Sequence, residues 1–449
     1  MKIRKVLFFL KISLYIGIFF YSSYADDFLI DIYKSLDETN IIVKKYYYSY
    51  KKQDALYKKS ISSLFPTLSL QQTYTRNDPK TVERMDISNK IPIPGVDIEP
   101  TIYENSYKTS FVLSWNLFNA SLYANIKLNR ILRNIESYNF KYNKLKEYND
   151  IISNIYDLLL KELDVEYNYN KFIKDSLSYL KTKVGKETQL IEDYRLNLSK
   201  INYNLTKIDL NNSIINLRET KTQLKSKFIE IDLDTILYSD ISSTIEKIIN
   251  YNIDKENWKE KSTLIKIQES SHKIKELTYK SSYYQFVPIV NLTYLYGWQE
   301  NNTIELDGYN TWSLRITLTW TLFNPSYYYN ITSSYYDKKS SYYNMLYNIN
   351  TLKNTEESMK KNIKELKKSW KQIEDMEKEY NNILEVAKSQ YQDSIISYED
   401  YLDTYLKFLE VKKRKIQIEK TLVSLILTYI SNNLDINEFE NYLLNRKEK

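Results

Sequence analysis

Two stretches of this chain, residues 120–183 and 325–392, lack the residues that interrupt a helix. Neither contains a glycine, and the one proline, Pro325, stands at the first position, where a helix accepts it. Each stretch is therefore expected to form one continuous helix, roughly 96 and 100 Å long at a rise of about 1.5 Å per residue. With only 5 glycines and 7 prolines among 449 residues, the chain is unlike a loop-rich enzyme, and its fold class is expected to be mainly α.

Apolar residues recur along both stretches at steps of mostly three and four, the spacing of a coiled-coil seam. A soluble helical bundle or rod would show the same seam. Asn119 and Asn324 precede the two stretches and are good N-cap residues. The seam positions are Leu128, Ile131, Ile135, Tyr138, Tyr142, Leu145, Tyr148, Ile152, Ile155 and Leu159 in the first stretch, and Met359, Ile363, Leu366, Trp370, Ile373, Met376, Tyr380, Ile383, Ala387 and Tyr391 in the second.

A short motif repeated before each long stretch indicates an internal duplication. Trp115–Ser121 reads WNLFNAS and Trp320–Ser326 reads WTLFNPS, and upstream FPTLSL in the first copy corresponds to VPIVNL in the second. Each half reads helix, strand, loop, strand, long helix, helix. We expect a first repeat over residues 26–239 and a second over residues 240–449, which share one architecture instead of forming two independent domains.

Four segments with strictly alternating apolar and polar residues are expected to be strands, at about residues 66–76, 106–117, 287–298 and 312–323. One face of each is apolar with aromatic residues near its ends, and the other face is polar. Such runs of about 10 residues are typical of transmembrane β-barrel strands, although a half-buried sheet on a soluble core has the same period. The aromatic residues favour the membrane, and we expect interface positions for Trp115, Trp298, Trp312 and Trp320.

Four strands cannot close a barrel, whose smallest bacterial form has about eight. An open sheet in lipid would leave edge N–H and C=O groups without partners, at a cost of several kcal/mol each. If these strands span a membrane, copies of the chain must complete the barrel together. Two copies would give about 8 strands and three about 12, and only the larger barrel leaves a useful lumen.

The first 25 residues look like a secretory signal peptide, with a basic start, an apolar run from Val6 to Tyr21, and small residues at Ser23 and Ala25. An uncleaved membrane anchor is the alternative. Removal of this segment takes away four basic residues and lowers the net charge from +7 to about +3. The charge therefore gives no support to nucleic-acid binding.

The sequence contains no cysteine and one histidine, His272. The lack of cysteine excludes disulfides and thiolate metal sites. A single histidine nearly excludes histidine triads and His-ligated zinc sites. No glycine-rich phosphate-binding loop is present. His272 is expected to be a surface residue. We therefore expect no catalytic residue, no cofactor and no metal site, and a protein that is not an enzyme.

Return turns are expected after both long helices, at residues 183–186 and at residues 393–396. Helices over residues 187–230 and 397–430 then run back. Because each long helix would span roughly 100 Å, the turns are expected at the far end of the object from the strands.

In this pattern the chain resembles the TolC-like outer-membrane efflux protein family, the outer membrane factors. The resemblance covers nearly the whole mature chain and is carried by the paired Trp-x-Leu-Phe-Asn segments, the proline-led first strands and the two helix-tip turns. It implies a homotrimer in the bacterial outer membrane, with a 12-stranded β-barrel of four strands per chain, continued by an α-helical coiled-coil tunnel into the periplasm. It also implies a passive exit duct of a tripartite efflux or type I secretion system, with a periplasmic adapter (membrane fusion) protein and an inner-membrane pump as partners.

The resemblance also assigns adapter-docking roles at the two tips. Val184 and Gly185 resemble the family's Val-Gly docking turn, and Ser394 and Ile395 belong to the second tip. Ser394 stands where the family has glycine. In the first tip Ile191 replaces an expected acid, with Glu192 and Asp193 adjacent to it.

A gating segment is implied at the second tip. Tyr391 matches the family's tip tyrosine, and Asp400 and Asp403 match the acids that ring the closed aperture, whereas Ile396 replaces a gating arginine. Three copies of two carboxylates around a narrow pore would attract cations and repel anions. The alternative is that Asp400 and Asp403 are simply solvated residues of a helix.

Two functional classes remain: a trimeric exit duct, and a structural or adhesive coiled-coil surface protein that uses the strands only as an anchor. A duct wall needs two strand pairs and two long hairpins per chain, whereas a stalk needs one. The expected outer loops, at about residues 77–105 and 299–311, hold no large passenger for adhesion. The duplication therefore favours the duct.

Overall fold

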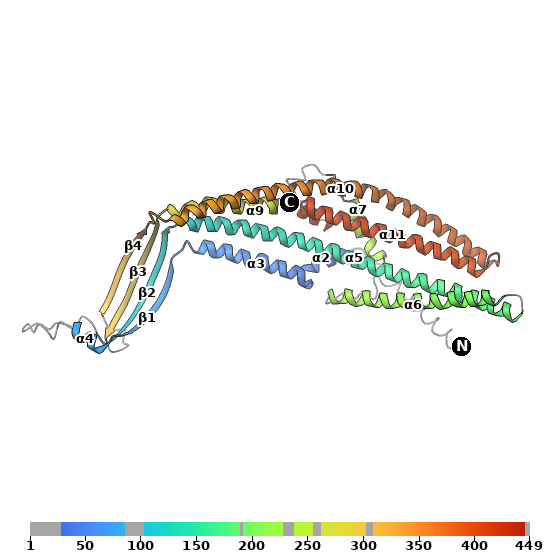
Figure 1. The fold of residues 1–449 in the computed structure, drawn as a ribbon, viewed down its shortest axis with the longest axis horizontal. Helices are drawn as coiled ribbons and strands as arrows, with labels where there is room; N and C mark the ends of the chain where they lie inside the picture. The colour runs from blue at the N-terminus through green and yellow to red at the C-terminus, as the bar shows by residue number, and fades with distance from the viewer. Residues whose placement is uncertain are drawn as a thin grey trace, which may run out of the picture. The chain divides into compact units, whose positions relative to one another are not determined.

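The computed structural model describes residues 28–85, 103–188, 192–227, 238–254, 262–301 and 309–444. The expected signal peptide and most of the two expected outer loops lie outside these ranges. The described chain consists of long helices and one four-stranded sheet (Figure 1). The helices are α2 (Phe28–Thr39), α3 (Ile41–Ser62), α4 (Pro79–Met85), α5 (Ala120–Glu187), α6 (Asp193–Lys227), α7 (Ser239–Asn250), α9 (Thr263–Ser282), the 3₁₀ turn η3 (Tyr283–Phe286), α10 (Pro325–Gln392), α11 (Tyr398–Asn433) and α12 (Ile436–Leu443). The strands are β1 (Thr67–Arg76), β2 (Asn105–Phe118), β3 (Ile289–Asn301) and β4 (Tyr309–Thr319).

The chain divides into two compact units, and each takes segments from both halves of the sequence. The sheet unit comprises Tyr50–Ile135 and Glu269–Met345, and the core unit comprises Met1–Ser49, Glu136–Gln268 and Leu346–Lys449. Each unit therefore contains parts of both expected repeats. No helix in the described ranges has both the length and the apolar character needed to cross a membrane.

The sheet has the strand order β1–β2–β3–β4, and every neighbouring pair is antiparallel. The register places the apolar residues of all four strands on one face, since Leu70 pairs with Phe111, Phe111 with Tyr296, and Tyr296 with Trp312. The strands β1 and β4 form the two edges. The large side chains of the apolar face that are exposed in the single chain include Leu68, Leu70, Tyr74, Phe111, Trp115, Phe118, Tyr294, Trp312, Leu314, Ile316 and Leu318.

Strands β2 and β3 approach each other closely at Gly297, which pairs with Ser110. A Cβ atom at Gly297 would lie 2.4 Å from the carbonyl oxygen of Thr109 and 2.7 Å from the Cβ atom of Ser110. Only glycine fits such an approach without displacing the neighbouring backbone.

The duplicated motif makes the same contact twice at the junctions between helices and strands. The indole N–H of Trp115 donates to the carbonyl of Leu64 at 2.9 Å, and the indole N–H of Trp320 donates to the carbonyl of Phe286 at 2.9 Å. Each carbonyl lies two residues before the proline that leads into a first strand. The tryptophan at the end of one strand thus fixes the chain that enters its neighbour.

The N-caps expected from the sequence are confirmed. The side-chain oxygen of Asn119 accepts the backbone N–H of Ser121 at 3.0 Å, and that of Asn324 accepts the N–H of Ser326 at 3.0 Å. Both long helices contain 68 residues, which corresponds to roughly 100 Å.

Three expected boundaries were wrong, and one of them is the start of the first returning helix, which is Asp193 and not residue 187. Helix α5 continues through Gly185 to Glu187, so the first return turn does not lie at residues 183–186. A single glycine in a helix costs only about 1 kcal/mol relative to alanine, which the rest of a long helix can absorb. Strand β4 ends at Thr319 and not near residue 323, because Thr319 pairs with Ile289, the first residue of β3.

In the sheet unit the helices follow the order of the strands. Arg133 of α5 lies 4.9 Å over the ring of Tyr57 of α3, and α5 and α9 line a common groove that includes Leu277. Between α9 and α10, Lys275 pairs with Asp337 at 3.0 Å. The sequence of neighbours is therefore α3, α5, α9 and α10, with α3 and α10 at the ends.

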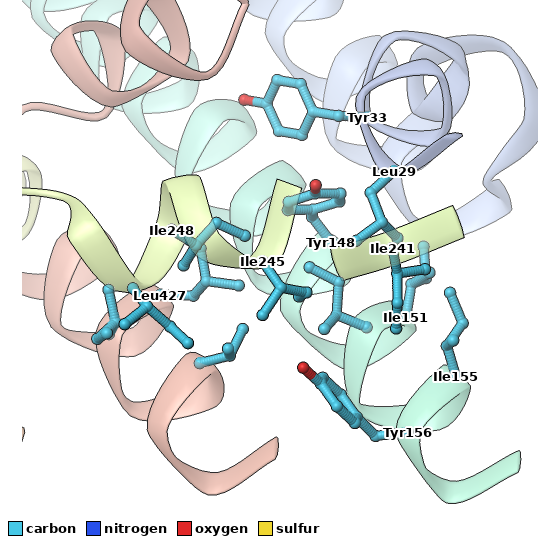
Figure 2. Close-up of a cluster of buried hydrophobic side chains, with 14 of the residues drawn as sticks. Leu29, Tyr33, Tyr148, Ile151, Ile155, Tyr156, Ile241, Ile245, Ile248 and Leu427 are labelled. Atoms are coloured by element: carbon cyan, nitrogen blue, oxygen red, sulfur yellow. The ribbon is translucent and has the colours of Figure 1, made fainter. Parts of the chain in front are cut away.

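In the core unit the short helix α7 is the centre of a hydrophobic cluster. Figure 2 shows its isoleucines facing side chains of α2, α5 and α11, and all of these residues are buried. The seam expected in the first long helix is buried from Leu145 to Leu159, whereas in the second Ile363 and Ile373 are buried but Met376 and Ile383 are exposed. The residues labelled in the cluster are Leu29, Tyr33, Tyr148, Ile151, Ile155, Tyr156, Ile241, Ile245, Ile248 and Leu427.

A glutamate is buried beside this cluster. Glu419 of α11 is 2% exposed, and both of its carboxylate oxygens accept the phenol O–H of Tyr238, at 2.9 and 2.8 Å. Burial raises the pKa of Glu419, and the hydrogen bond from Tyr238 and the charge of Lys415 oppose that rise. The charged form is therefore less favourable in the folded chain than in the unfolded one.

We predict that Glu419→Gln raises the melting temperature at about pH 8, because the amide oxygen still accepts from Tyr238 without a buried charge. The folded-state pKa of Glu419 is raised, so protonation stabilises the native chain below that pKa, and this stabilisation is lost as the pH rises through it. The advantage of the variant should therefore shrink as the pH falls to about 5. Circular dichroism melts in detergent measure this, with the exposed Glu365→Gln as control. A variant less stable than the native chain at pH 8 would contradict the prediction.

Candidate functional site

The candidate site is the tip of the hairpin formed by α10 and α11, together with the neighbouring end of α5. The turn between α10 and α11 lies at residues 393–396, as expected. Ser394 has a φ of 59°, in the left-handed region that favours glycine. Its N–H donates to the carbonyl of Tyr391 at 3.0 Å, and the N–H of Ile395 donates to the carbonyl of Gln390 at 2.8 Å. These two bonds form a Schellman motif, which explains the glycine expected at position 394.

Helix α11 begins with a capping box formed by Ser397 and Asp400. The side chain of Asp400 accepts the backbone N–H of Ser397 at 3.2 Å, and the hydroxyl of Ser397 accepts the N–H of Asp400 at 3.1 Å. The hydrogen bonds from Ser397 hold the pKa of Asp400 below its usual value. Asp400 therefore has a structural role in starting the helix, whatever it contributes to an aperture.

A ladder of aromatic rings runs along the tip. The ring of Tyr391 stacks on that of Tyr401 with centroids 5.8 Å apart and lies 5.2 Å from that of Tyr398. The ladder continues from Tyr401 to Tyr405 at 6.3 Å. Burial, followed by a hydrogen bond to Glu166 of α5, raises the pKa of Tyr405. Tyr391 is therefore held by its neighbours and is not a free side chain.

Ile396 takes the place of the gating arginine and behaves as an apolar residue. It is half-buried and lines a groove between α10 and α11 together with Ile383 and Val386. Across the described residues, no cluster of three or more histidine, aspartate or glutamate side chains could hold a metal ion.

Charged pairs connect α5 to α11 along the length of the hairpin. Near the tip, Lys174 pairs with Asp403, and Lys181 pairs with Glu399 at 2.9 Å. Further along, Lys413 pairs with Asp164 at 2.5 Å and Lys420 with Asp157 at 2.6 Å. The charge of Asp403 is thus partly balanced within its own chain.

At the first tip, Val184 and Gly185 lie in the last turn of α5 and not in the return turn itself. Val184 is exposed, and Lys186 pairs with Asp193 at the start of α6. Ile191 lies outside the described residues. The expected docking turn is therefore a helix end with one exposed apolar side chain.

The four tryptophans assigned to membrane interfaces lie at two levels of the sheet. Trp115 and Trp320 lie at the end from which α5 and α10 continue, and Trp298 and Trp312 lie toward the opposite end. From Trp312 to Trp320 is eight residues, or about 26 Å of extended chain. The interface role stays a prediction, and the indole hydrogen bonds of Trp115 and Trp320 give these two residues a second role at the junctions.

The structure brings the predicted aperture residues to one tip but gives each a partner that the sequence reasoning missed. The Ser-x-x-Asp pattern of Ser397 and Asp400 before an apolar run was a readable signal for a capping box. The spacing of Tyr398, Tyr401 and Tyr405 likewise indicated one helix face. Lys174 gave no signal, because its partner lies 229 residues away in the sequence.

We predict that Ser394→Gly stabilises the tip by roughly 1 kcal/mol, since glycine has no Cβ penalty in the left-handed conformation. Ser394→Ala is the matched control, because it removes the hydroxyl but keeps the Cβ atom. Hydrogen exchange of the amides at the start of α11 should slow in the glycine variant only. Equal exchange in the two variants would show that the backbone at this position is not strained.

Solved structures of other proteins share this architecture, although their sequences differ widely from this one. No protein-family model matches the sequence, and no curated protein sequence is significantly similar to it. Solved structures do match along almost the whole chain. The Campylobacter jejuni CmeC outer membrane channel is 15% identical, with a TM-score of 0.68 over 96% of this chain and 92% of its own. The open state of the Neisseria gonorrhoeae MtrE outer membrane channel is 12% identical, with a TM-score of 0.64 over 91% and 89%. The Vibrio cholerae outer membrane protein VceC is 12% identical, with a TM-score of 0.62 over 91% and 97%. The chain therefore has the TolC-like fold of these outer-membrane channels, as its resemblance to that family implied.

Proposed function

We propose that this protein is the outer-membrane exit duct of a tripartite efflux or type I secretion system. In this proposal three copies form a barrel of about 12 strands in the outer membrane, and their long helices form a tunnel into the periplasm. The duct is passive, and a periplasmic adapter and an inner-membrane pump supply cargo and energy.

The open sheet carries this proposal. A four-stranded sheet with an exposed apolar face and two unpaired edges is incomplete in one chain. In lipid its edge N–H and C=O groups need partners, which the edges of further copies supply. The strand pairs continue into two helices of 68 residues each, so a closed ring of strands would continue into a ring of helices. The likeness to outer-membrane channels supports the same assembly.

The helix tips are the proposed contact points for the adapter. Val184 and Ile395 are exposed apolar residues at the two tips, and Gly185 and Ser394 lie beside them. Exposed apolar side chains at the ends of long helices are suited to burial against a partner. Tyr391, Asp400 and Asp403 are proposed to lie around the aperture.

The assembly is tested by the size and conductance of the detergent-extracted protein. We expect a particle of three chains that forms channels in planar lipid bilayers. A monomer without conductance would refute the duct.

We predict that Asp403→Asn lowers the preference of the channel for cations, because one carboxylate per chain is lost at the aperture. Lys174→Gln should act in the opposite direction, since it frees the charge of Asp403. Reversal potentials in a salt gradient measure both effects. Glu410→Gln is the control, because Glu410 also lies on α11 but accepts the phenol of Tyr167 at 3.0 Å, further from the tip. Unchanged ion selectivity in both Asp403→Asn and Lys174→Gln would show that these two residues do not lie at the aperture.

A further inference from the structure

Helix α10 carries a row of exposed tyrosines at intervals of seven residues. Tyr329, Tyr336 and Tyr343, here named the tyrosine stripe, are 71%, 65% and 64% exposed. Seven residues are close to two helical turns, so the three rings lie on one face. Three large aromatic rings exposed on one face of a helix are typical of an interface and not of a free surface.

The tyrosine stripe faces away from the rest of its own chain. The contacts of α10 with α9 are made through other residues, including Asp337 with Lys275 and Tyr335 with Tyr279. Half-buried positions such as Ile331, Lys338 and Met345 lie on that same side of α10. At 100° per residue, the tyrosine stripe lies on the opposite side of the helix.

Helix α3 carries a matching row of lysines at the same interval. Lys45, Lys52 and Lys59, here named the lysine stripe, are exposed. The contacts of α3 with α5 are made through Gln53 and Tyr57, on a different face. Within the described residues, Lys52 and Lys59 make no ion pair.

No unpaired acidic residue lies near either stripe on its own helix. The acidic residue of α3 is Asp54, which pairs with Lys58 at 2.8 Å and lies near Arg133 of α5. Between Tyr329 and Asn350 the acidic residue is Asp337, which is already paired with α9. Lys52 and Lys59 therefore offer cations without an ion-pair partner in the described residues, whereas Lys45 already lies 5.7 Å over the ring of Tyr46. The tyrosine stripe offers ring faces and phenol oxygens.

The two stripes lie on α3 and α10, the helices that adjoin the two edge strands, and all of their residues except Lys45 belong to the sheet unit. Helix α3 leads into β1 through residues 63–66, and α10 leaves β4 through residues 320–324. Counted from the sheet end of each helix, the lysines lie about 3, 10 and 17 residues away and the tyrosines about 4, 11 and 18, a mismatch of roughly 1.5 Å. If β4 of one copy pairs with β1 of the next, the two stripes meet in register.

We propose that the tyrosine stripe of one chain packs on the lysine stripe of a second copy and sets the register between subunits. This inference rests on the proposed assembly and names the side chains that hold its helical part together. Each ammonium lies over a ring face or donates to a phenol oxygen, and the methylene stem of each lysine covers the neighbouring ring. The expected pairs are Tyr329 with Lys59, Tyr336 with Lys52, and Tyr343 with Lys45.

Cysteine cross-linking tests the pairing directly, because the native chain has no cysteine. Tyr336→Cys and Lys52→Cys are placed in separate chains that are expressed together, so that any disulfide joins two molecules. A disulfide requires Cα atoms within about 7 Å, which makes the readout local. Tyr336→Cys with Lys51→Cys is the control, since position 51 lies at the same height but about 100° around the helix.

We expect covalent dimers with Lys52→Cys several-fold more abundant than with the Lys51→Cys control. Trimeric, conducting channels without this excess would overturn the inference and leave the proposed duct standing. A monomer without conductance and without cross-links would overturn both.

Dissociation of the extracted assembly gives a second readout. The double variant Lys52→Gln/Lys59→Gln should dissociate more readily, by about two- to fivefold for each pair lost, whereas Lys52→Arg/Lys59→Arg should retain the native behaviour. Equal dissociation of the glutamine and arginine variants would contradict a cation–π contact.

Discussion

The backbone groups at the edges of the sheet impose the strongest constraint on this protein. Strands β1 and β4 each present one row of N–H and C=O groups without a partner in the sheet, and the apolar face beside them is exposed. A sheet of this kind is an aggregation hazard in water and is untenable in lipid unless its edges are paired. The order of the helices follows from the order of the strands, because each of these helices directly precedes or follows one strand. The two end helices therefore lie beside the two edge strands.

The core unit is organised around a short helix and a few buried carboxylates. Helix α7 supplies a short apolar face around which much longer helices pack, and two carboxylates buried in the unit accept hydrogen bonds from tyrosine hydroxyls. Glu356 accepts the phenol of Tyr429 at 3.0 Å and pairs with Lys360 at 2.7 Å, much as Glu419 accepts from Tyr238. The hydrogen bonds between buried carboxylates and tyrosine hydroxyls are directional, so they constrain how the helices pack in a way that contacts between isoleucines do not.

Much of the fold was predictable because helix breakers and strand alternation act locally. Helix α10 has the limits expected from the sequence, residues 325–392. The apolar faces of all four strands were identified from the alternation of apolar and polar residues. The end of α5 was misjudged because one glycine, Gly185, was given the weight of a turn. The central role of α7 was missed because a helix of 12 residues gives a weak periodic signal next to helices of 68.

The candidate site was predictable in position but not in its contacts. Asp400 and Asp403 do lie near a helix tip, and the capping box that Asp400 forms with Ser397 could be read from four consecutive residues. The ion pair of Asp403 with Lys174 joins two helices that are far apart in sequence, so it depends on the finished packing. Single-sequence reasoning finds caps and turns, whereas pairs of this kind require the tertiary structure.

The rows of charge between α5 and α11 also determine how this hairpin responds to its surroundings. Toward the tip the two helices are joined by lysine–carboxylate pairs at the surface, whereas α7 and the isoleucines around it hold the interior. Exposed pairs are screened by dissolved salt over a Debye length of about 8 Å at physiological ionic strength, and apolar contacts are not. The charged pairs that attach the tip to α5 therefore weaken as ionic strength rises, while the apolar contacts of the core do not, so the salt content of the surrounding compartment acts on the tip more than on the core.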